Sequence, residues 1–157
     1  MKNSRKKKRV WLRRLSWVAF IIYLAGMAYF LFFSEGLHRS GTGGYRYNLV
    51  LFQEIKRALY CLRNGNIRYF LLNVVMNVAA FAPFGFFLPI ISPKNKKFLN
   101  VFLLSLELTL TIELLQLLFR VGIFDVDDIV MNTLGGAAGY GIYYLGKKIE
   151  RMREHGR

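Results

Sequence analysis

The residues best suited to chemistry lie in and just before a short acidic segment. Residues 120–132 read RVGIFDVDDIVMN and hold three of the nine acidic residues in a chain whose net charge is +14. Carboxylates can accept hydrogen bonds, ligate divalent cations or act as general bases. Just upstream, residues 113–120 (ELLQLLFR) add Glu113, Gln116 and Arg120 to an otherwise apolar stretch. The pattern predicts one polar site around the acidic segment.

Helical spacing predicts which of these side chains share a face. Glu113, Gln116 and Arg120 follow at i, i+3 and i+7, so they form one stripe of a helix. Two other helices carry comparable stripes, namely Asp128, Asn132, Gly135 and Gly139 on one and Asn73, Asn77 and Ala80 on the other. We expect the three stripes to face one another. The predicted binding cluster comprises Asn77, Glu113, Gln116, Arg120, Asp125, Asp128 and Asn132.

Charge and hydrogen-bonding capacity suggest the pairings within this cluster. Arg120 is expected to pair with Asp125 or Asp128, and Glu113 to accept hydrogen bonds from the Asn77 or Asn132 amides. Asp127 points away from Asp128 in helical order and is expected to be only solvated. A structural interpretation stays open, because interhelical amides and a G-x-x-x-G spacing also hold membrane helices together.

Composition identifies the elements that position the cluster. Hydrophobic residues make up 54% of the 157 residues. They occur in runs of about twenty, the length that crosses roughly 30 Å of hydrocarbon. We predict a single all-α domain over residues 1–157, an integral membrane bundle of four transmembrane helices at about residues 15–33, 70–91, 98–119 and 129–145. Pro83 is expected to bend or break the second helix, and Pro89 to mark its end.

The outer loop, residues 34–69, contains a further helical pattern. Residues 48–63, NLVLFQEIKRALYCLR, place apolar side chains on one face and charged ones on the other. The segment is too short and too charged to span, so we predict an interfacial or re-entrant helix.

Lysine and arginine predict the orientation. They collect in the tail at about residues 1–14, in the turn at residues 92–97 and after residue 146. These three segments share one side of a four-helix bundle, which places both termini in the cytoplasm of a multi-pass cell-membrane protein. The basic residues flank apolar spans, so they indicate membrane lipids as partners and not nucleic acid.

Four segments carry a family resemblance. They are NLVLF at residues 48–52, NVAAFAPFGFFLP at 77–89, ELLQ at 113–116 and FDVDDIVMNTLGGAAGY at 124–140. The sequence resembles the VanZ-like family of small bacterial membrane proteins, whose prototype is associated with teicoplanin resistance. The resemblance implies a multi-span membrane protein and a role in tolerance of lipoglycopeptide antibiotics. The first motif of the family usually reads NLVPF, so Leu51 is a departure that leaves the turn of this loop open.

Two functions of different classes fit these residues. One is a non-enzymatic protein whose polar pocket at the outer membrane face handles a lipid or lipidated molecule, such as a lipid-linked wall precursor or a lipoglycopeptide. The alternative is a membrane enzyme acting on a lipid-linked cell-envelope substrate. In that case Glu113 is the candidate catalytic base and Asp125, Asp127 and Asp128 hold a divalent cation. A scaffold or assembly partner is a third possibility.

The first interpretation is favoured, although the residues leave open whether any reaction is catalysed. The sequence has no serine or cysteine in a nucleophile motif, no H-x-x-x-H pair and no glycine-rich phosphate loop. Three aspartates within four residues fit a helix-capping loop as well as a metal site. We therefore predict neither a metal nor a cofactor.

Overall fold

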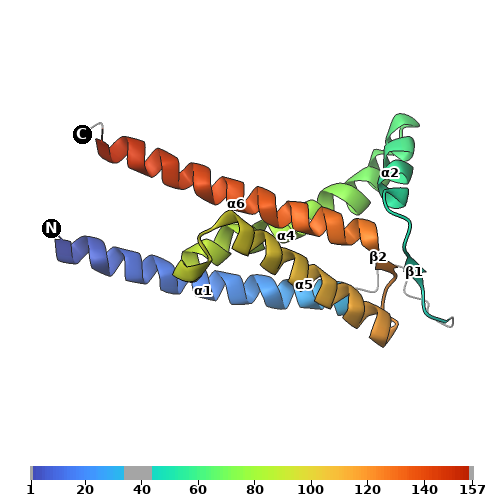
Figure 1. Ribbon diagram of the computed structural model, residues 1–157, viewed down its shortest axis with the longest axis horizontal. Coiled ribbons are helices and arrows are strands. Elements are labelled where there is room, and N and C mark those ends of the chain that lie inside the picture. The colour runs from blue at the N-terminus through green and yellow to red at the C-terminus, as the bar shows by residue number, and fades with distance from the viewer. Residues whose placement is uncertain (1, 34–43, 156–157) are drawn as a thin grey trace.

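A computed structural model describes residues 2–33 and 44–155 and confirms an all-α fold. The elements are α1 (Lys2–Phe33), β1 (Tyr47–Asn48), α2 (Gln53–Arg63), α3 (Ile67–Phe70), the π-helical η2 (Leu71–Val75), α4 (Met76–Ile91), the 3-10 turn η3 (Pro93–Asn95), α5 (Phe98–Phe119), β2 (Phe124–Asp125) and α6 (Val126–His155). The long helices run along the length of the molecule (Figure 1). Both ends of the chain lie at one end of the bundle, while α2, β1 and β2 lie at the other.

Three helical segments within the described residues are long and apolar enough to cross a membrane. They are Val10–Phe30, Ile67–Ile91 and Phe98–Phe119. The fourth predicted span, in α6, is not among them. Its apolar part, at residues 129–145, is interrupted by Asn132 and by several glycines and tyrosines, which lower its mean hydropathy.

The helix bounds confirm some predictions and correct others. α5 coincides with the predicted helix at residues 98–119. α1 begins at Lys2, so most of the predicted basic tail is helical. α6 continues to His155, well beyond residue 145. Within the predicted outer loop, α2 confirms the helical pattern, and residues 34–43 lie outside the described part of the chain.

Of the expected bend or break at Pro83, the break is absent, and the bend stays a prediction. α4 is helical from Met76 to Ile91, with both Pro83 and Pro89 inside it. The irregularity lies earlier, in the π-helical residues Leu71–Val75. One proline removes a single backbone donor, and packing of neighbouring helices can hold the helix on either side of it. α1 makes such a contact, because the Tyr23 hydroxyl donates to the Ala80 carbonyl oxygen at 2.6 Å.

Glycines bring α4 and α6 into close contact. A Cβ atom added at Gly135 would clash with the Val78 carbonyl oxygen, and one added at Gly139 with that of Ala82. This confirms that the predicted G-x-x-x-G spacing admits another helix backbone. The contact fixes α6, and with it the acidic segment at its start, against α4.

Replacing Gly139 by alanine is expected to destabilise the bundle. The new methyl group would push α6 away from the Ala82 carbonyl, at a cost of about 1–3 kcal/mol. The thermal unfolding midpoint in detergent should fall. Gly141→Ala is the matched control, because a Cβ on Gly141 has no atom within 4 Å. Equal midpoints for the two variants would contradict the close approach.

Candidate functional site

Two loops meet at the end of the bundle away from the termini. β1 and β2 pair in parallel, with Tyr47 opposite Phe124 and Asn48 opposite Asp125. The Phe124 backbone N–H also donates to the Arg46 carbonyl oxygen at 3.0 Å. The outer loop and the acidic segment, distant in sequence, therefore form one structure.

Asp125 ties this pairing to α6. Its Oδ1 accepts the Asp127 backbone N–H at 2.8 Å, as an N-cap residue does, and the Asn48 amide donates to both its oxygens at 3.2–3.3 Å. Its own backbone N–H donates to Glu113 Oε2 at 3.0 Å. Burial raises the pKa of the Asp125 carboxyl, and the hydrogen bonds from Asp127 and Asn48 act in the opposite direction.

Asp127 has a role that the sequence analysis missed. Its side chain is 0% exposed, so the expectation that it is only solvated is wrong. Its carboxylate accepts the backbone N–H groups of Phe52, of Glu54 at 2.7 Å and of Ile55 at 3.2 Å. These are donors at the start of α2, where Phe52 adopts a left-handed conformation with φ 64°. Asp127, at the start of α6, therefore caps the start of α2.

Glu113 and Asn132 lie beneath this assembly, on α5 and α6. Glu113 is 2% exposed, and the Asp125 backbone N–H is the partner of its carboxylate, not the expected amides. The Asn132 amide donates to the Thr109 hydroxyl at 2.9 Å. Asn132 Oδ1 is buried without a hydrogen-bond partner among the described residues. Glu113 therefore connects α5 to the acidic segment, and Asn132 connects α6 to α5.

A cavity of about 860 Å³ opens at this end of the molecule. Its lining comes from the segment before α2, from α2 itself, from the start of the α3–α4 helix and from the α5–α6 connection. The charged lining residues are Arg46, Glu54, Arg57, Arg120, Asp125 and Asp128. Gln116 and three tyrosines, Tyr45, Tyr47 and Tyr69, also contribute. Glu113, Asn77 and Asn132 are not part of this lining.

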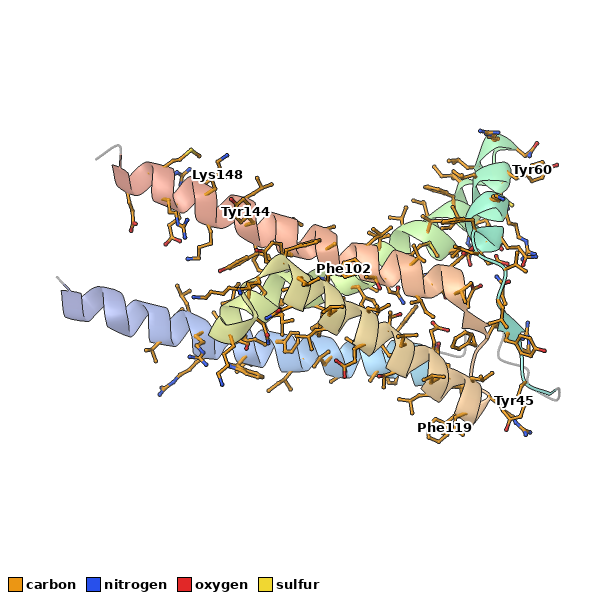
Figure 2. All side chains as sticks on the ribbon, in the orientation of Figure 1. Tyr45, Tyr60, Phe102, Phe119, Tyr144 and Lys148 are labelled. Atoms are coloured by element: carbon orange, nitrogen blue, oxygen red, sulfur yellow. The ribbon has the colours of Figure 1, made fainter. Side chains whose placement is uncertain are left out.

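Arg120 differs from its predicted pairing. It ends α5 in a left-handed conformation with φ 55°, and its guanidinium lies 4.7 Å from the centre of the Tyr45 ring. Among the described residues, Arg120 has no ion pair with Asp125 or Asp128, so the expected Arg120–Asp pair is absent. The left-handed residue turns the chain sharply, and the side chain leaves toward the outer loop. Figure 2 shows Tyr45 and Phe119 at this end.

Asp128 is the carboxylate that faces the cavity from α6. The Asn77 amide donates to its Oδ1 at 2.6 Å, so the predicted stripes on α4 and α6 do meet. In the part of the chain that is described, Asp128 has no ion pair. From α2, Glu54 binds Arg57 at 2.6 Å and accepts the Tyr69 hydroxyl at 2.9 Å. The cavity therefore combines arginines, an unpaired carboxylate and tyrosine rings.

The lining residues of the outer loop were absent from the predicted cluster. Gln53 and Arg57 lie on the polar face of the helix predicted within residues 48–63. That polar face was the sequence feature that could have indicated their place in the cavity lining. The β1–β2 pairing, which brings it over the acidic segment, joins residues 77 positions apart and has no local signature.

Two of the three aspartates bind backbone N–H groups at helix starts. Within residues 2–33 and 44–155, no group of three or more histidine, cysteine, aspartate or glutamate side chains could hold a metal ion. Asp125 and Asp127 direct their oxygens at backbone N–H groups instead. Two of the three residues that the enzyme alternative assigned to a divalent cation are thus hydrogen-bonded to backbone N–H groups in this structure.

Comparison with known proteins places this geometry in a family. The model of the VanZ/LLP1 family matches residues 20–147, which run from within α1 to within α6. The chain belongs to the VanZ/LLP1 family. Protein VanZ of Enterococcus faecium is 38% identical over 84 residues, which is 54% of this chain and 49% of that protein. The chain thus matches about half the length of this curated VanZ protein.

No solved structure matches the chain. Its VanZ/LLP1 membership and its three apolar helices together indicate a membrane protein. The segments that carry the family resemblance contribute the β1–β2 pair, the Asp127 cap and the Asn77–Asp128 contact. They are residues 48–52, 77–89, 113–116 and 124–140.

Proposed function

We propose that this protein binds a lipid or lipidated molecule in the outer cavity and thereby contributes to tolerance of lipoglycopeptide antibiotics of the teicoplanin type. The cavity carries the proposal. Its arginines can bind phosphate or carboxylate groups, Asp128 can accept an amine or hydroxyl, and tyrosine rings suit the membrane interface. The family membership supports the same class of function.

The cavity opens beside apolar surface, which suits a ligand with an acyl chain. Leu49, Val50, Leu51 and Phe52 precede α2, and each is at least 47% exposed. Exposed aliphatic and aromatic side chains next to a polar cavity can contact acyl chains while the cavity binds the headgroup. A lipid-linked wall precursor and a lipoglycopeptide both combine a polar head with such a chain.

The proposed topology is multi-pass, with both termini in the cytoplasm and the cavity at the outer face of a bacterial cell membrane. α6 would be the fourth span, since about 17 residues from Ile129 to Leu145 suffice for a thin or tilted crossing. Lysines and arginines at the shared end of the termini support this orientation, and Figure 2 marks Lys148 toward that end.

Cysteine labelling should verify the topology. Cys61 is the single cysteine, so Cys61→Ser gives a cysteine-free background. An impermeant maleimide should label Tyr60→Cys on intact cells, because Tyr60 is 69% exposed on α2. Asn95→Cys, in the turn between α4 and α5, should react only after permeabilisation. Labelling of position 95 from outside would reverse the proposed orientation.

The function is tested by deleting the gene and measuring growth inhibition by two drugs. The deletion should increase sensitivity to teicoplanin and leave sensitivity to a glycopeptide without an acyl chain unchanged. The wild-type gene should restore tolerance. Equal shifts for the two drugs, or no shift, would refute a role tied to the lipidated molecule. Lipid and wall-precursor analysis of the same strains would reveal conversion of a lipid, which would favour an enzyme.

A further inference from the structure

A second charged group lies inside a membrane span, far from the cavity. Glu107 is near the middle of α5 and is exposed on its surface. Within residues 2–33 and 44–155 its carboxylate has no recorded hydrogen bond or ion pair; only its backbone carbonyl accepts, from Thr111 at 2.8 Å. A charge near the bilayer centre costs roughly 2.5–3.5 kcal/mol on insertion scales. Contact with lipid alone would leave this cost unrelieved.

Glu107 belongs to a regular seam on α5. Leu103, Glu107, Leu110 and Leu114 follow at intervals of four, three and four residues, and each is exposed. At 100° per residue they lie within a sector of about 60°, opposite the buried Val101, Ser105, Thr109 and Ile112. The spacing is that of two helices in a left-handed coiled coil, where one polar residue in a leucine seam fixes register.

The sequence restricts what can satisfy this carboxylate. Lysine and arginine are absent from residues 15–33, 69–93, 98–119 and 121–146, which cover the middle of every proposed span. A second copy therefore cannot provide a cation at this depth. A protonated carboxyl group is both donor and acceptor, so two carboxyl groups can satisfy each other without any other component.

We propose that two copies of this chain associate through α5, with Glu107 of one hydrogen-bonded to Glu107 of the other. Copies with the same orientation in the membrane place this residue at equal depth, and a two-fold axis along the membrane normal brings it opposite itself. The leucines on either side of Glu107 would pack against the same leucines of the second copy. The opposite face of α5 packs on α4 and α6.

Disulfide cross-linking in membranes tests the proposal. In the Cys61→Ser background, Leu103→Cys and Leu110→Cys should give covalent dimers on oxidation. Ile22→Cys is the control, because Ile22 is 66% exposed on α1, outside the seam. Two differently tagged copies, expressed together, should both be present in the product. Adding Glu107→Leu should lower the cross-linked fraction about fivefold or more. Glu107→Gln, whose amide also donates and accepts, should retain it.

Three outcomes would contradict the proposal that a second copy of this chain associates through α5. They are cross-linking at positions 103 and 110 no greater than at position 22, cross-linking unaffected by Glu107→Leu, and a product that contains another protein in place of the second tagged copy. Immunoblots of total membranes should show equal accumulation of all variants. The readout is independent of antibiotic tolerance, so it stands apart from the proposed function.

Discussion

Asp127→Ala should release α2 from the bundle and destabilise the end of the molecule that holds α2, β1 and β2. The substitution removes the acceptor of three backbone N–H groups, those of Phe52, Glu54 and Ile55, at a site where the carboxylate is fully buried. Charge-assisted bonds of this kind contribute about 1.5–3 kcal/mol each, and a lost cap alone costs about 1 kcal/mol. Because the losses are not additive, we expect a total of about 3 kcal/mol.

Hydrogen–deuterium exchange in detergent or nanodiscs would measure this effect. Amides of residues 52–63 should exchange faster in Asp127→Ala, whereas those in the middle of α5 should change little. Asp127→Asn retains one acceptor oxygen and should give an intermediate rate. Glu150→Gln, which removes an exposed carboxylate at the other end of the molecule, serves as the charge control. Unchanged exchange over residues 52–63 would show that α2 does not depend on this cap.

Asp128→Asn should abolish most of the proposed binding while preserving the fold. The asparagine has the same shape, and its oxygen can still accept the Asn77 amide. Only the charge in the cavity is removed. A charge-assisted hydrogen bond to the ligand is about 1.5–3 kcal/mol, so affinity should fall about tenfold or more. Teicoplanin tolerance in the complemented deletion strain should fall with it.

The comparison requires protein levels and stability to be equal. Asp128→Asn should accumulate in membranes and unfold at the wild-type temperature, and Glu150→Gln should restore tolerance fully. Full tolerance with Asp128→Asn would remove the carboxylate from the binding site. Loss of tolerance accompanied by loss of protein would instead identify Asp128 as a structural residue.

Local pattern was sufficient for most of the helices. α5 and α2 follow from hydropathy and from amphipathic spacing, and the close approach at Gly135 and Gly139 follows from the G-x-x-x-G pattern. The extension of α1 back to Lys2 did not follow, because a basic segment has little hydrophobic signal although lysine and arginine are good helix formers. Whether Pro83 breaks α4 depends on how neighbouring helices pack against it, and the sequence alone does not give that packing.

The predicted cluster and the cavity lining share four residues, and the contacts between distant segments were not predicted. Gln116, Arg120, Asp125 and Asp128 were expected together and all line the cavity. Helical spacing also placed Asp127 on a different face of α6 from Asp128. It did not show that the start of α2 lies against that face. Arg120 left the expected stripe because the helix ends at this residue in a left-handed turn. Each of these failures concerns a contact between segments far apart in the chain.

The cap on α2 also constrains the order in which the chain can fold. The acceptor for the Phe52 N–H lies 75 residues further along the chain. During synthesis the first turn of α2 is complete before Asp127 has been made, so its donors must remain bonded to water or lipid headgroups. Contacts of such large sequence separation form late, because closing a long loop is entropically costly. The cavity is therefore expected to form last, after the start of α6 has been synthesised, and incompletely synthesised chains would lack it.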